Sequence, residues 1–211
     1  TLYHRLGELC ARIWSESDIG ISVTTHGHHL TNDLVRQLEG HVSVVRVSID
    51  TIEPHYSTIR GRSLIELIRI LSRARSSFPI GVNTVVNGAT LPMLDKLGSI
   101  VRALHAVDWL LLPEVHDGEF TLSGSEWRTF DSWVARNYHY YSLRVTSEAI
   151  PAMTVPLLLQ QEPESYAHVS ASGSLRWCSY HEGGVELKDK SVIEALGQLR
   201  AQSNMMISSQ E

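Results

Sequence analysis

Short runs of β-forming apolar residues alternate along the first 145 residues with segments of helical period. The apolar runs lie at residues 20–25, 44–49, 80–86, 109–115 and 141–145. Between them, apolar residues recur three and four positions apart, as they do on one face of a helix. Regular alternation of strand and helix is typical of βα units, so the pattern predicts a parallel sheet with helices on its outside.

Residues that cap helices stand where this reading needs them. Ser63 can cap the helix that ends before Pro79, and Thr31 or Asn32 can cap the one that ends before Gly40. A side-chain oxygen at the first position accepts a hydrogen bond from a backbone N–H that the helix cannot satisfy itself. These signals support the helical segments independently of their apolar period.

The pattern loosens after Pro151, where prolines and glycines interrupt it before a last helical segment near residues 191–200. We therefore expect residues 1–150 to form the α/β unit and residues 151–211 a C-terminal extension or lid. Within the extension, Ser172 and Gly173 join two short apolar runs and predict a β-hairpin.

Polar residues follow the apolar runs at the point where each predicted strand ends. They are Thr24, Thr25 and His26, then Ser48 and Asp50, then Asn83 and Asn87, and last Glu114 and His116. Alternation gives three of the strands one polar row each: Ser22, Thr24 and His26; Arg46, Ser48 and Asp50; and Asn83, Val85 and Asn87. Such rows favour a partial barrel whose interior holds a polar ligand. The alternative is an edge sheet whose polar rows face solvent.

Composition excludes several classes of partner. The 18 basic and 23 acidic residues give a formal charge of -5, and no basic run with interleaved aromatic residues predicts a nucleic-acid groove. The apolar runs are far shorter than the roughly 20 residues that span a bilayer, so no membrane partner is expected. Two cysteines, Cys10 and Cys178, form neither a disulfide framework nor a CxxC pair, which favours a reducing cytoplasm.

Four stretches resemble, in their order and spacing, the motifs of the radical SAM enzymes. They are "TLYHRLGEL", "TTHGHHL", "VSIDTIEPHYSTIRG" and "VNTVVN", within roughly residues 1–118. In that family a GGEP turn leads into a helix, followed by a TNG-like turn, an SxD strand, an RG element and a strand with spaced asparagines. Short members such as the viperins look most similar in "SID", "IRG" and "VNTVVN".

The resemblance implies a six-stranded partial (β/α) barrel of the TIM type. In such enzymes a 4Fe–4S cluster binds S-adenosylmethionine and cleaves it reductively, with an electron from an external donor. The 5′-deoxyadenosyl radical then takes a hydrogen atom from the substrate. The substrate of this chain is not predicted, because the partial barrel serves peptides, nucleotides and small metabolites.

Particular residues take on roles through this resemblance. Thr25 or His26 would edge the cofactor, Ser48 and Arg60 would hold its carboxylate or ribose, and Asn83 would reach the ribose or the substrate. A carboxylate suits a guanidinium and a hydroxyl donor, and a ribose suits side chains that both donate and accept. Candidates on the substrate side are Asn87, Glu114, His116 and Cys178.

The sequence departs from the family in lacking the first strand of the barrel, the CxxxCxxC loop after it, which ligates the cluster, and the GGEP turn. Thr1 stands where the residue after GGEP would be, so we expect a segment before residue 1 to carry both motifs. Without it the chain would be inactive and would hold no cluster, since thiolate ligands cannot be replaced by the residues present. The alternative is a scaffold relative that has lost its cluster.

The histidines of "HGHH" also allow a different enzyme class. His26 and His28 have the HxH spacing of barrel hydrolases, and Asp50, Glu114 or His116 could complete a divalent metal site. The simpler expectation is that His28 and His29 are surface residues of a loop.

In the extension, "RWCSYHEGG" places Cys178 three residues before His181. This predicts either a substrate-side loop with a reactive thiol or an ordinary buried cysteine beside a turn.

Overall fold

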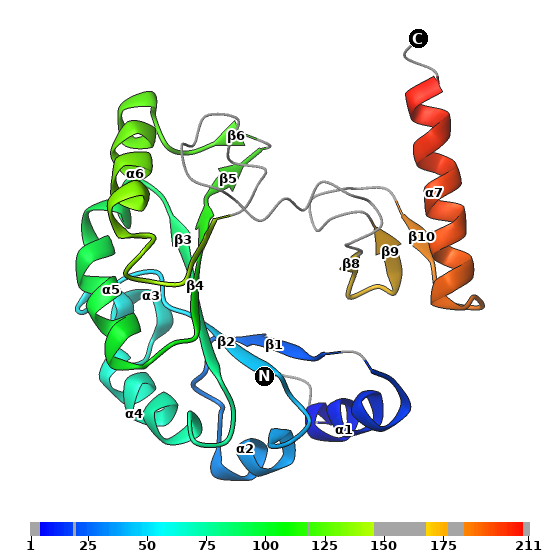
Figure 1. Ribbon diagram of the computed structural model, residues 1–211, viewed down its shortest axis with the longest axis horizontal. Helices are drawn as coiled ribbons and strands as arrows, with labels where there is room; N and C mark the ends of the chain where they lie inside the picture. The colour runs from blue at the N-terminus through cyan, green and yellow to red at the C-terminus, as the bar shows by residue number, and fades with distance from the viewer. Residues whose placement is uncertain (1–4, 19, 118, 146–167, 177–183, 209–211) are drawn as a thin grey trace. The chain divides into compact units, whose positions relative to one another are not determined.

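The computed structural model describes residues 5–18, 20–117, 119–145, 168–176 and 184–208 (Figure 1). The chain divides into two compact units, Thr1–Leu157 and Leu158–Glu211. No helix in the described ranges is long and apolar enough to cross a membrane.

A five-stranded parallel sheet forms the centre of the first unit. Its strands are β1 (Ser22–Thr25), β2 (Val44–Ser48), β3 (Ile80–Val86), β4 (Asp108–Pro113) and β7 (Leu143–Val145). They are ordered β1-β2-β3-β4-β7, and every neighbouring pair is parallel. Each strand falls within or next to a predicted apolar run. The predicted parallel α/β fold, an open partial barrel, is confirmed.

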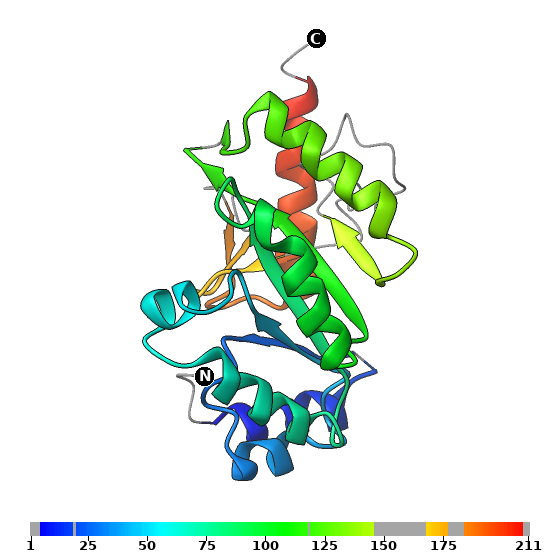
Figure 2. The same cartoon turned by 90° about the vertical axis from the view of Figure 1, so that its left-hand side faces the viewer.

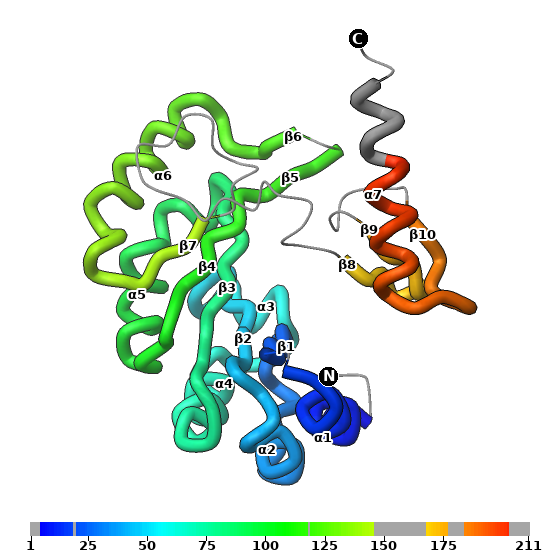
Figure 3. The backbone as a smooth tube through the Cα atoms, turned by 45° about the vertical axis from the view of Figure 1, so that its right-hand side comes forward, coloured from blue at the N-terminus to red at the C-terminus, as the bar shows by residue number. Residues whose placement is uncertain are grey.

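Helices cover one face of this sheet. They are α1 (Leu6–Glu16), α2 (Asn32–Leu38), α3 (His55–Arg60), α4 (Leu64–Ala74), α5 (Leu94–Ala103), which the 3₁₀ helix η1 (Leu91–Met93) precedes, and α6 (Gly124–Asn137). Seen from the helix side in Figure 2, α4 and α5 lie over the strands. Figure 3 shows the sheet curving, with these helices on its outer side. We call the opposite side of the sheet its inner face.

The predicted strand at residues 109–115 is shorter than expected. β4 ends at Pro113, and Val115–His116 form β5, which pairs antiparallel with β6 (Glu119–Phe120). Pro113 has no N–H to donate to a neighbouring strand, so it suits a strand end.

The predicted caps form as expected. Thr31 Oγ1 accepts a hydrogen bond from Leu34 N at 3.2 Å, and Ser63 Oγ accepts one from Ile65 N at 3.1 Å. Helix α6 has a full capping box, in which Ser123 and Glu126 each satisfy the other's backbone.

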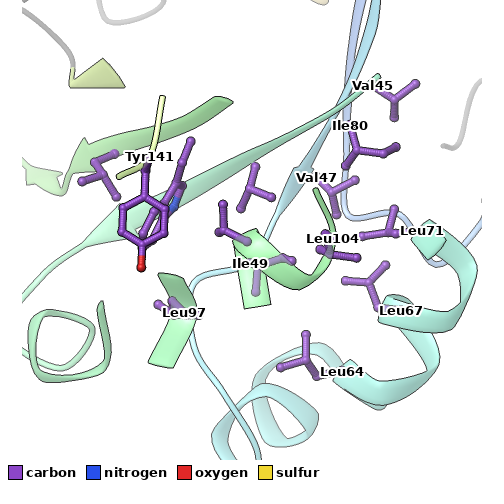
Figure 4. Packing of buried hydrophobic residues seen from close by; sticks show 14 of the residues in the cluster. Val45, Val47, Ile49, Leu64, Leu67, Leu71, Ile80, Leu97, Leu104 and Tyr141 are labelled. Atoms are coloured by element: carbon purple, nitrogen blue, oxygen red, sulfur yellow. The ribbon is translucent and has the colours of Figure 1, made fainter. Parts of the chain in front are cut away.

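The core lies between the sheet and the helices. Val45, Val47, Ile80, Val82, Trp109 and Leu111 point from the strands into this layer and are fully buried or nearly so. Leu67 and Leu71 from α4 and Leu97 from α5 belong to the same cluster (Figure 4). Trp109 and Thr84 pair their polar atoms within this layer, because Trp109 Nε1 donates to Thr84 Oγ1 at 2.9 Å and Thr84 Oγ1 donates to Ile49 O at 2.7 Å.

The second unit has an antiparallel sheet and one helix. β8 (His168–Val169), β9 (Ser174–Arg176) and β10 (Val185–Glu186) pair in the order β10-β9-β8, and α7 covers Val192–Ser208. Leu175, Val185, Ala195 and Leu199 form its core. The predicted hairpin is confirmed, and Gly173 takes the left-handed φ of +83° that its turn requires. Cys178 and His181 lie outside the described residues.

Candidate functional site

The register of the parallel strands brings the predicted polar rows together. Ser48 is aligned with Asn83, and Asn83 with Leu110, so these side chains share the inner face. Thr24 of β1 is aligned with Arg46 of β2, which lies two residues before Ser48 on the same face. The polar positions of separate strands therefore form one surface, as the sequence predicts.

A cleft of about 350 Å³ opens at the carboxyl ends of β2, β3 and β4. Asp50, Asn87 and Glu114 line it from the loops after these strands, and His55 and Ile59 line it from α3. Ligands of parallel α/β sheets bind at this edge. We call it the carboxyl-edge cleft.

A larger hollow of about 690 Å³ lies at the opposite edge, where Ile80 and Val107 mark the amino ends of β3 and β4. Ser76, Ser77 and His105 are among its other lining residues. Parallel sheets carry their catalytic and ligand-binding residues at the carboxyl ends of the strands, so the larger volume does not make this hollow the better candidate for a ligand site.

Asp50 and Arg60, both singled out from the sequence, form an ion pair at the rim of the cleft. Asp50 Oδ1 also accepts a hydrogen bond from Val85 N at 2.9 Å, which ties the loop after β2 to β3. The Arg60 side chain is 31% exposed, and it ends helix α3. The guanidinium is thus held by the fold at a position that solvent and ligands can reach.

Asn87 and Glu114 meet across the ends of β3 and β4. Asn87 Oδ1 accepts hydrogen bonds from Ala89 N and Thr90 N, at 3.0 and 2.9 Å, and so builds the turn after β3. Its Nδ2 donates to Glu114 Oε2 at 3.1 Å. Asn87 is largely committed to the structure of the cleft, whereas Glu114 keeps a carboxylate oxygen, Oε1, without a hydrogen bond among the described residues.

Ser48 and Asn83 have polar atoms that the described part of the chain does not satisfy. The Ser48 hydroxyl makes no hydrogen bond there, and Asn83 uses only its Oδ1, which accepts from Arg46 Nη1 at 3.3 Å. Arg46 in turn pairs with Asp108 at 2.5 Å. The sequence reading placed Arg46 in a polar row but missed Asp108, although an acidic residue at the start of a buried strand was a usable signal.

Thr25 does not share this surface. It is aligned with Val47, which faces the helices, and its side chain is buried. Its Oγ1 accepts a hydrogen bond from Gly27 N at 3.2 Å and closes the turn after β1. Of the two residues predicted to edge the cofactor there, His26 is the exposed one.

His28 is buried, and the expectation that it is a surface residue is wrong. Its Nε2 lies 3.0 Å from the hydroxyl of Tyr56 in α3, and burial, followed by the charge of His26, lowers the pKa of His28. The cause is the turn at Gly27, whose φ of +82° sends the chain back against α4. A Cβ at Gly27 would lie 2.6 Å from Leu67 Cδ1. His29 is exposed, as expected.

The structure does not assemble the divalent metal site that the HxH spacing allowed. Over the ranges that the structure describes, no three His, Cys, Asp or Glu side chains are grouped so that they could hold a metal ion. His116 lies on β5, is 82% exposed and pairs with Asp117, so it is not among the residues that line the carboxyl-edge cleft. Cys10 is buried in α1, where burial raises the pKa of its thiol.

Comparison with known proteins gives a likeness in structure. No protein-family model matches the sequence. The crystal structure of Streptococcus suis SuiB is similar with a TM-score of 0.66 at 12% identity, over 95% of this chain and 55% of that chain. SuiB bound to S-adenosylmethionine gives 0.67 at 11% identity, over 95% and 54%. SuiB bound to the precursor peptide SuiA gives 0.66 at 11%, over 92% and 51%. The chain therefore shares the SuiB fold and spans about half of that protein's length.

Proposed function

We propose that this chain is part of a radical SAM enzyme that binds S-adenosylmethionine at the inner face and cleaves it reductively at a 4Fe–4S cluster. The observation that carries the proposal is the match of 95% of the chain to SuiB, which has been crystallised with S-adenosylmethionine. The family motifs in the sequence support it independently, because "TTHGHHL", "VSIDTIEPHYSTIRG" and "VNTVVN" include the carboxyl ends of β1, β2 and β3 in the same sheet.

The donor set at this edge fits the proposed cofactor. Ser48 and Asn83 retain polar atoms toward the inner face, and both residues donate and accept hydrogen bonds, which suits ribose hydroxyls. Arg60 at the rim suits a carboxylate. Burial, followed by neighbouring charges that include Arg60, lowers the pKa of His26, so the proposal places His26 beside the same ligand. The carboxyl-edge cleft of about 350 Å³, a volume within the range of small-ligand pockets, is lined by Asp50, the partner of Arg60, and not by Ser48 or Asn83 themselves.

The cluster requires ligands from outside these 211 residues. Only two cysteines occur, and the thiol of Cys10 is buried in a helix. When bound, the cluster supplies the electron that cleaves S-adenosylmethionine to a 5′-deoxyadenosyl radical for hydrogen abstraction. The chain's own residues hold and orient the cofactor, and Glu114 and Asn87 line the side on which we place the substrate. SuiB's bound precursor peptide makes a peptide the first substrate class to test.

In this proposal residues 1–150 form the barrel part and residues 151–211 an extension of it or a lid. Cys178 stays a substrate-side candidate. Limited proteolysis between the two parts, with and without S-adenosylmethionine, tests the lid, because ligand-dependent protection is expected only if the extension closes over a bound cofactor.

The decisive experiment uses the intact protein, reconstituted anaerobically with iron and sulfide. We expect broad absorption at about 400 nm from a cysteine-ligated cluster, and 5′-deoxyadenosine after addition of a low-potential reductant. Absence of both, in protein whose cysteines are intact, would contradict the proposal.

Arg60→Ala should weaken S-adenosylmethionine binding by about 1.5–3 kcal/mol, the scale of a lost charge-assisted hydrogen bond. The fold should persist, since Asp50 keeps its bond to Val85 N. Isothermal titration calorimetry measures the change, and Arg62→Ala is the matched control because Arg62 is an exposed arginine two positions away. Equal affinities in the two variants would remove Arg60 from the site.

A further inference from the structure

Three charged side chains from β2, β4 and β7 form ion pairs across the inner face, below the carboxyl-edge cleft. Arg46 Nη2 on β2 donates to Asp108 Oδ2 on β4 at 2.5 Å, and Arg144 Nε on β7 lies 3.2 Å from the same oxygen. The side chains of Arg46 and Asp108 are only 15% and 7% exposed. We call these three residues the ionic bridge.

Gly81 allows the ionic bridge to cross the intervening strand. The register aligns Arg46 with Gly81 and Gly81 with Asp108, so the guanidinium passes directly over the glycine. A Cβ at Gly81 would lie 2.7 Å from Asp108 Oδ1 and 3.2 Å from Arg46 Nη1. A side chain at this position would therefore occupy the path between the two charged groups.

Arg46 also contacts Asn83, the residue that the proposed function places beside the ligand. Nη1 donates to Asn83 Oδ1 at 3.3 Å, and Asn83 stands two positions after Gly81 on the same face of β3. A guanidinium has only donors, so it donates to the amide oxygen of Asn83 and disfavours an amide turned so that its NH₂ faces Arg46. The contact therefore sets which end of the Asn83 amide faces away from Arg46.

We propose that Arg46 is a positioning residue, which fixes the Asn83 amide so that its NH₂ is presented to an acceptor oxygen of S-adenosylmethionine. Asn83 Nδ2 makes no hydrogen bond within the described part of the chain, as a donor kept for a ligand would. Arg46 acts through Asn83 and is itself held by Asp108. The inference rests on the proposed function and adds to it the residue that orients the ligand-facing amide.

The test is a double-mutant cycle on the intact, reconstituted protein, with S-adenosylmethionine affinity measured by calorimetry. Arg46→Lys keeps a positive charge beside Asp108 but cannot fork to both Asp108 and Asn83. We expect binding about five- to twentyfold weaker when Asn83 is present, and a change of less than about twofold in the Asn83→Ala background, the coupling typical of contacting residues. Arg36→Lys, in an exposed ion pair with Asp33 on α2, is the matched control and should change nothing.

Equal losses in both backgrounds, or no loss in either, would overturn the inference, because Arg46 would then not act through Asn83. If Arg46→Lys does not fold, Asp108→Asn replaces it, since the neutral amide releases Arg46 without altering its atoms. The same dependence on Asn83 is expected, and an equal loss with and without Asn83 again overturns the inference. Failure of the unsubstituted protein to bind S-adenosylmethionine would reject the proposed function itself, and this inference with it.

Discussion

The two faces of the five-stranded sheet are built from neighbouring residues of the same strands, yet their side chains have different surroundings. On β2, Val47 is fully buried against the helices, and Ser48, the next residue, is half-buried on the inner face. On β3, Val82 and Asn83 are both buried, but Val82 faces the helices and Asn83 turns a polar side chain to the inner face. Because successive side chains of a strand point to opposite faces, one residue packs in the core and the next can face a ligand.

Polar groups differ between the faces in a second way. On the helix side Trp109 and Thr84 are paired within the fold, in a chain of hydrogen bonds that runs from Trp109 through Thr84 to Ile49 O. On the inner face Ser48 and Asn83 retain polar atoms without partners in the described ranges. The difference indicates that substitutions on the helix side change stability, whereas those on the inner face change ligand binding.

The largest effect is expected from Trp109→Ala. Trp109 is fully buried, and its ring packs edge-on against Trp133 and Tyr141 with centroids 5.6 and 5.3 Å away. Removing it leaves a cavity and a Thr84 hydroxyl that still donates to Ile49 O but no longer accepts a hydrogen bond, so the free energy of unfolding should fall by about 3–5 kcal/mol. Urea unfolding followed by circular dichroism measures this.

Trp14→Ala is the matched control for that experiment, because Trp14 lies on α1 and is 51% exposed. Its change should stay within about 1 kcal/mol, since it removes little buried surface. Similar losses for the two tryptophans would contradict the assignment of the core to the helix-covered face.

Gly81→Ala lies on the inner face, yet we expect it to lower stability, unlike other substitutions on that face. The new methyl group would enter the path of the ionic bridge, so the free energy of unfolding should fall by about 1–3 kcal/mol. Gly124→Ala is the control, since Gly124 begins α6 and a Cβ there meets only Arg128 Nη1, at 4.0 Å. A Gly81→Ala protein as stable as the control would show that the bridge adapts to the methyl group.

The sequence was sufficient to predict what depends on local pattern. Strands, helix caps, the hairpin at Gly173 and the polar rows follow from alternation, from capping chemistry and from turn residues. Each of these is decided within a few positions along the chain. The alignment of Ser48 with Asn83 was also predictable, because the carboxyl ends of parallel strands meet at one edge.

Contacts between distant residues could not be predicted in this way. Arg46 and Asp108 are 62 positions apart, and their pairing depends on the register of three strands and on the missing side chain at Gly81. His28 was misplaced for a similar reason. Its burial depends on the turn at Gly27 and on Tyr56, which lies 28 positions further along. The local pattern of three histidines after a strand predicts neither the direction of the turn at Gly27 nor the contact with Tyr56.

The smallest expected effect is a dependence of the free energy of unfolding on pH, caused by His28. Burial lowers the pKa of His28 in the folded protein below its ordinary value of 6.5. As pH falls below about 6.5, the unfolded chain therefore takes up a proton that the folded protein still refuses, and stability decreases until the folded pKa is passed. Above that range His28 contributes its full stability.

His28→Gln should remove this part of the fall in stability, since an amide can still bond to the Tyr56 hydroxyl and does not titrate. Urea unfolding between about pH 7.5 and 5 measures the difference in slope against the unsubstituted protein. His29→Gln is the matched control, because it removes the adjacent imidazole, which is exposed, and it should keep the original slope. If His28→Gln and His29→Gln gave the same profile as the unsubstituted protein, the buried imidazole would not be the group that titrates. The pKa of His28 would then not differ between the folded and the unfolded protein.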